Sequence, residues 1–133
     1  MIAALIYAVV MVYFAIYESK GDYDTIRSGE GVDHPAVFSW RVFVAVVAAV
    51  VTCWIAGLGT AHGFLLLLVA VGAFGITFRH NLNHMRGLDW WYVSPSNEYD
   101  KFWIRSTGSV QQAGMAATIT EAAIGITGLA AFL

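Results

Sequence analysis

Residues 62–78 read HGFLLLLVAVGAFGITF, an apolar run that ends at the basic residue Arg79. A helix of about 17–25 apolar residues can cross the hydrocarbon core of a bilayer. Three further apolar runs, residues 2–17, 38–55 and 110–133, lie before and after it in the chain. The four runs together predict an all-α fold in which four transmembrane helices form one bundle.

The composition favours a membrane protein over a soluble one. Of the 133 residues, 59% are hydrophobic and 12% are charged, whereas soluble domains average about 25% charged residues. A soluble protein with so little charge would expose large apolar patches and associate. The net charge of −2 gives no reason to expect a nucleic-acid partner. We expect the partners to be the lipid bilayer and either other membrane subunits or further copies of this chain.

We predict a single helical membrane domain over residues 1–133. The transmembrane helices are expected at about 2–18, 36–56, 61–79 and 109–132, with a polar loop at 19–35 and an interfacial segment at 80–107. The lone Cys53 lies in an apolar run and is expected to be a small buried residue, because it has no partner for a disulfide.

Basic residues predict the topology. All seven lie near the first and third connections between the apolar runs: Lys20, Arg27, Arg41, Arg79, Arg86, Lys101 and Arg105. Because Lys and Arg are retained on the cytoplasmic side during insertion, both termini are expected outside a plasma or inner membrane, with segments 19–35 and 80–107 in the cytoplasm. No basic residue precedes the first run, so we interpret that run as a retained helix and not as a signal peptide.

The interfacial segment is rich in aromatic residues. Tyr99, Phe102 and Trp103 recur at i, i+3 and i+4, which predicts a short amphipathic helix at about 95–106 on the membrane surface, ended by Gly108. Basic and aromatic residues of the segment are expected to contact lipid headgroups or to form a docking platform for a partner. They are Arg79, Arg86, Trp90, Trp91, Lys101, Trp103 and Arg105.

Glu121 is the most unusual residue of the last apolar run. It lies about twelve residues into the run, accompanied by the polar Gln112 and Thr118, and a carboxylate in hydrocarbon is costly unless it is paired or faces the interior. No Lys or Arg is expected at the same depth, so the sequence predicts that Glu121 has no partner in its own chain. Three interpretations are open: a neutral hydrogen-bonded Glu, a pair with another subunit, or proton or ion handling.

The surroundings of Glu121 carry one local resemblance. Residues 117–125 read ATITEAAIG, which resembles the carboxylate-bearing helix of rotary ATPase proteolipid subunits. The resemblance covers that helix alone, because the glycine-repeat first helix of that family is absent. Small residues spaced by four, such as Gly114, Thr118 and Ala122, predict that the last helix packs closely against another helix.

His80 and His84 form the second candidate site. Two His at i and i+4 lie on one face of a helix, as two metal ligands on a helix must. The HxxxH pattern is also one of the boxes of membrane di-iron desaturases, but the chain has only four His in all, too few for that family's ligand set. A metal site completed by an acidic residue or His34, a haem with one axial His, or plain interfacial hydrogen bonding are the alternatives.

No pattern of a familiar catalytic site is present, so no catalytic residue and no cofactor is expected beyond that metal or haem. The leading hypothesis is a small non-catalytic accessory subunit of a larger membrane assembly. The alternatives are a metal or haem protein that uses His80 and His84, and a small oligomeric ion or proton conductor that uses Glu121.

Overall fold

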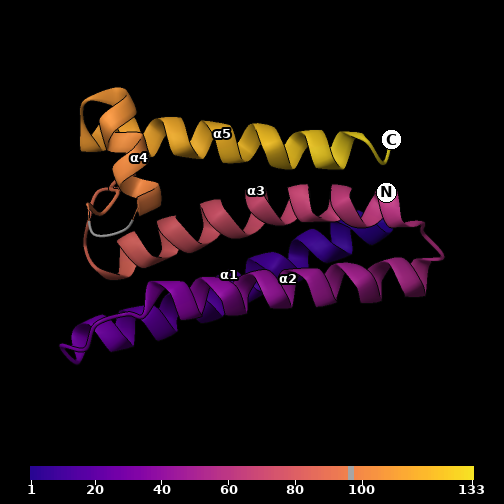
Figure 1. Ribbon diagram of the computed structural model, residues 1–133, viewed down its shortest axis with the longest axis horizontal. Coiled ribbons are helices and arrows are strands. Elements are labelled where there is room, and N and C mark those ends of the chain that lie inside the picture. Colours follow the sequence, from indigo (N-terminus) through magenta and orange to yellow (C-terminus); the bar gives the residue numbers. More distant parts are fainter. Residues whose placement is uncertain (96–97) are drawn as a thin grey trace.

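Five helices make up the computed structural model, which describes residues 1–95 and 98–133 (Figure 1). They are α1 (Ile2–Arg27), α2 (His34–Ala56), α3 (Thr60–Met85), α4 (Glu98–Thr107) and α5 (Val110–Ala130). All but α4 are long and apolar enough to cross a membrane. Helix α3 is central: α1 and α2 pack against it, and α5 packs against it on another side. The short α4 runs across one end and contacts α5.

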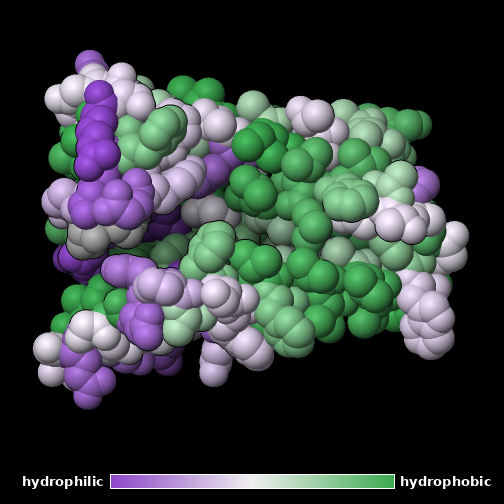
Figure 2. Space-filling view, in the orientation of Figure 1, coloured by the Kyte–Doolittle hydropathy of each residue, from purple (hydrophilic) through white to green (hydrophobic). Residues whose placement is uncertain are grey.

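Charged residues are confined to one end of the bundle. Every Lys, Arg, Asp and Glu except Glu121 falls within residues 18–41 or 79–105, and hydrophilic residues gather at that end of the space-filling view (Figure 2). We call it the charged end. The opposite, uncharged end holds both chain termini and the turn at residues 57–59 (Figure 1).

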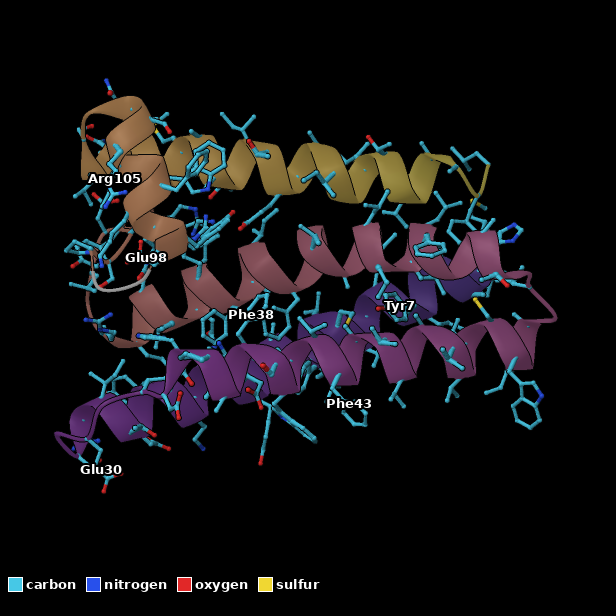
Figure 3. The ribbon with its side chains drawn as sticks, viewed as in Figure 1. Tyr7, Glu30, Phe38, Phe43, Glu98 and Arg105 are labelled. Carbon is cyan, nitrogen blue, oxygen red and sulfur yellow. The ribbon has the colours of Figure 1, made fainter. Side chains whose placement is uncertain are left out.

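The hydrophobic core lies between α1 and α3. Met11 and Leu66 are fully buried there with small alanines around them. Tyr7 is also buried, and its hydroxyl donates to the carbonyl oxygen of Ala45 on α2 at 3.0 Å. Because nothing in hydrocarbon can satisfy a hydroxyl, this bond ties α1 to α2. Figure 3 shows Tyr7 between the helices and Phe43 pointing away from the bundle.

Helix α1 is longer than predicted. It continues nine residues past the expected end at residue 18, so only residues 28–33 separate it from α2. One reason is an ion-pair cluster: Arg41 of α2 binds Glu18 at 3.1 Å and Asp22 at 2.9 Å, one helical turn apart on α1. The Arg41 guanidinium also lies 4.1 Å from the ring centre of Phe78. Arg41 is therefore held by the bundle and does not extend freely to the headgroups.

The predicted short helix exists as α4, with boundaries shifted toward the C-terminus. It begins at Glu98 and ends before Gly108, which has a positive φ of 81°. Residues 96 and 97 of the predicted range lie outside the described residues. Tyr99 is 49% exposed and Phe102 is 58% exposed, whereas Asp100 is buried and accepts a hydrogen bond from the backbone amide of Ser94 at 2.9 Å. Helix α4 thus turns part of its aromatic face outward.

Helices α3 and α5 meet along a seam of glycines. A Cβ at Gly72 would lie 2.7 Å from the Cα of Gly125, and a Cβ at Gly128 would lie 2.8 Å from the Leu65 carbonyl oxygen. The absence of side chains lets the two backbones touch, as in other small-residue helix pairs. The packing face of α5 consists of Ala113, Gly114, Ala117, Glu121, Gly125 and Gly128. The face away from α3 exposes Ile119 and Ile126.

Candidate functional site

Glu121 lies in the α3–α5 seam with its carboxylate against Gly75. The residue is 5% exposed. A Cβ at Gly75 would lie 2.9 Å from its carboxyl carbon, so the glycine provides the space that the carboxylate occupies. Gly75 lies closer to the C-terminal end of α3, which is at the charged end of the bundle, than to the N-terminal end of that helix.

Arg79 is the partner of Glu121. Its Nη2 donates to Glu121 Oε1, and its Nη1 donates to Thr118 Oγ1 at 2.9 Å. The two charged side chains are 12% and 7% exposed. The prediction that Glu121 has no partner in its own chain is therefore wrong. Arg79 starts one turn beyond Gly75 on α3, about 6 Å at 1.5 Å per residue, and its long side chain reaches back along the seam.

Tyr99 connects α4 to this ion pair. Its hydroxyl donates to Glu121 Oε1 at 3.0 Å. Burial raises the pKa of the Tyr99 phenol, and the Glu121 carboxylate raises it further, so the phenol stays protonated and acts as the donor. The other carboxylate oxygen, Glu121 Oε2, is buried and has no hydrogen-bond partner among the described residues. One carboxylate thus joins α3, α4 and α5.

His80 forms a second set of contacts beside the ion pair. Its ring is 4% exposed and stacks on Trp90 with 4.0 Å between ring centres. Nδ1 lies 2.8 Å from the Trp90 carbonyl oxygen, and Nε2 lies 3.5 Å from Thr118 Oγ1. The side-chain amide of Asn83 donates to the Tyr92 carbonyl oxygen at 2.8 Å. These bonds hold the connection between α3 and α4 against α3.

The remaining predicted site residues lie outside this junction or at its edge. His84 is exposed, and the described residues hold no group of three or more His, Cys, Asp or Glu arranged to bind a metal. Gln112 is exposed in the first turn of α5, where its backbone amide donates to the Ser109 side chain. Lys101 pairs with Glu98 at 2.6 Å on the surface of α4, and Figure 3 places Glu98 and Arg105 on that helix at the charged end.

Several aromatic and basic residues of the predicted platform contact the junction or the end of α3. Trp90 covers His80 with one face and is 56% exposed. Trp91 meets the His80 ring edge-on, and Trp103 meets Tyr99 edge-on. Arg86 caps the C-terminal end of α3. The predicted platform is therefore built partly from side chains that the junction itself uses.

Sequence reasoning missed the residues that complete these contacts. Tyr99 and Asn83 were not expected at the site, although Tyr99 was placed on an amphipathic helix. It also missed the link between α1 and α3, where the Asn81 side chain donates to Ser19 Oγ at 2.7 Å. The spacing of Glu18 and Asp22, one turn apart and opposite an Arg in the next helix, was a readable signal for their ion pairs.

Comparison with known proteins adds no assignment: no family model, no curated protein and no solved structure matches this chain.

The chemical role of the junction is therefore inferred from its geometry. A buried Arg–Glu pair holds helices together, and its members are costly to separate. From Glu121 toward the uncharged end, the described seam continues through Gly72, Gly125 and Gly128 in backbone contact.

Proposed function

We propose that this protein is a small non-catalytic subunit of a larger membrane assembly. The observation that carries the proposal is that the charged and polar side chains at the α3–α4–α5 junction bind one another and the backbone. Arg79, Glu121, Tyr99 and His80 all act in this way. Their combined effect is to hold α4 and the connection before it in one position at the charged end.

The nearby hollows do not reach this junction. A cavity of about 680 Å³ lies between α1 and α2, and a groove of about 280 Å³ runs along α1, α3 and α5. Neither is lined by Arg79, His80 or Glu121. The pairing of the junction side chains with one another supports a structural role. The side chains that the junction presents outward are the exposed Trp90 and Phe102, which are suited to contact a neighbouring membrane subunit.

A native complex is the expected result of purification from the source membrane in mild detergent. Native mass spectrometry should give masses that exceed multiples of 14.5 kDa by the mass of other whole chains. Replacing both outward aromatics, Trp90→Ser with Phe102→Ser, should reduce the recovery of those chains. Trp54→Ser is the matched control, because Trp54 is 82% exposed at the uncharged end. Masses at clean multiples of this chain alone contradict the proposal.

We also propose that the charged end is cytoplasmic and that both termini are outside a plasma or inner membrane. The confinement of every basic residue to the charged end supports this orientation. In a Cys53→Ala background, Ser28→Cys should react with a membrane-impermeant maleimide only after cells are permeabilised. Gly59→Cys, in the turn at the other end, should react in intact cells. The reverse labelling pattern contradicts the orientation.

A further inference from the structure

The connection between α3 and α4 is held to α3 by few side chains. Over residues 86–95, the side-chain attachments to α3 described are the stacking and hydrogen bond of His80 to Trp90, its edge-on contact with Trp91, and the bonds from the Asn83 amide to the Trp90 and Tyr92 carbonyl oxygens at 3.4 and 2.8 Å. The Leu88 backbone amide also donates to the Asn83 carbonyl oxygen at 2.9 Å. Val93 is buried. We call the contact between His80 and Trp90 the His80 latch. Because the outer face of Trp90 is exposed, a small displacement of the connection brings water to the His80 imidazole.

The hydrogen bonds of the latch define the protonation state of His80. Nδ1 must carry a hydrogen, because the Trp90 carbonyl oxygen at 2.8 Å can only accept. Thr118 Oγ1 accepts from Arg79 Nη1, so its own hydrogen is free to point toward His80 Nε2 across the long contact of 3.5 Å. The closed latch therefore holds a neutral imidazole with Nε2 unprotonated.

A second proton on His80 is unfavourable in the closed latch for two reasons. It would occupy Nε2, the nitrogen that faces the Thr118 hydroxyl, and so remove the acceptor. It would also place a cation beside the Arg79 guanidinium, which contacts the same hydroxyl oxygen. In the open state the imidazole meets water, where both charge states are well solvated.

We propose that the His80 latch is a pH-sensitive contact, which opens when His80 is protonated and frees residues 86–95 from α3. The inference does not depend on the proposed function. Other titratable or charged groups lie on the elements packed around this end of α3, and the test below separates their effects from that of His80. They are Arg79 and His84 on α3, Glu121 on α5, Tyr99 and Asp100 on α4, Asp89 in the connection, and the mutually paired Glu18, Asp22 and Arg41 on α1 and α2.

The size of the effect follows from proton linkage. The closed latch binds one proton fewer than the open state, in which an exposed imidazole has the ordinary pKa of about 6.5. The latch is thus fully stable above that pH and loses stability as the pH falls below it. Lowering the pH from about 7.5 to about 5.5 is expected to raise the opening equilibrium constant about tenfold.

Hydrogen exchange in lipid nanodiscs tests the proposal. Peptides that cover residues 86–95 should exchange about tenfold faster at about pH 5.5 than at about pH 7.5, after correction for intrinsic rates. His84→Gln is the matched control, because it removes an exposed imidazole one turn further along the same helix, and it should keep the full pH dependence. His80→Asn, whose amide can still donate to the Trp90 carbonyl oxygen, should abolish it.

A second measurement needs no variant. Spectra of the protein labelled with ¹⁵N-histidine should show His80 as the neutral Nδ1–H form at about pH 7.5, and its protonation should coincide with the faster exchange. Exchange in the wild type that is independent of pH overturns the proposal. So does a pH dependence that persists in His80→Asn or disappears in His84→Gln.

Discussion

Glu121→Leu is expected to destabilise the folded protein by about 3–5 kcal/mol, because it leaves the Arg79 guanidinium buried without its carboxylate. Arg79→Leu should cost a similar amount for the converse reason. The double replacement removes both charges and leaves an apolar seam. It is therefore expected to cost less than the sum of the two single changes, with a coupling energy of about 2–3 kcal/mol.

Unfolding in mixed detergent and SDS micelles, followed by circular dichroism, measures the four free energies of this cycle. The surface pair of Lys101 and Glu98 is the control, because its side chains are 36% and 79% exposed. Lys101→Leu should change the unfolding free energy by about 0.5 kcal/mol or less. Additive effects of the two replacements in the Arg79–Glu121 cycle contradict the assignment of this pair as a buried, mutually dependent junction.

Gly114→Ala is the second change with a large expected effect. A Cβ at Gly114 would lie 1.7 Å from the carbonyl oxygen of Trp91 and 3.1 Å from its Cα. These are backbone atoms that cannot rotate away, so either α5 or the connection before α4 must move. We expect a loss of about 3 kcal/mol, together with loss of the His80 latch, because Trp90 and Trp91 belong to the same connection.

Gly21→Ala is the matched control for this substitution. Gly21 lies within helix α1 and has open space where its Cβ would be. Ala is favoured over Gly inside a helix by about 1 kcal/mol, so Gly21→Ala should be neutral or stabilising. The same unfolding assay compares the two, and hydrogen exchange over residues 86–95 reports the connection. A Gly114→Ala protein as stable as the wild type contradicts the close contact with Trp91.

The sequence alone led to the fold class, because each long helix must bury an apolar surface in lipid and its length is set by the bilayer. It predicted the order of the helices and the short helix before α5. It was less accurate at the charged end of α1. Hydropathy there falls after Tyr17, but the helix continues to Arg27, because Arg41 from another helix binds its next turns.

The candidate site shows a similar division. Arg79, His80, Trp90, Thr118 and Glu121 were each singled out from the sequence, but as members of three separate groups with three separate explanations. Counting residues along the chain places Glu121 in the middle of its helix and Arg79 at the end of another helix. Such a count contains neither the antiparallel register of α3 against α5 nor the length of the arginine side chain. The ion pair between Arg79 and Glu121 was missed for that reason.

Composition and periodicity determine which segments are helical and apolar, since these properties depend on residues close together in the chain. Basic residues predict an orientation for the same reason. The partners of Glu121 and His80 were decided only by tertiary structure. Glycines at positions 72, 114 and 125 bring distant backbones into contact, and Gly75 leaves space for the Glu121 carboxylate. This packing places a carboxylate from α5, a guanidinium from α3 and a phenol from α4 within hydrogen-bonding distance.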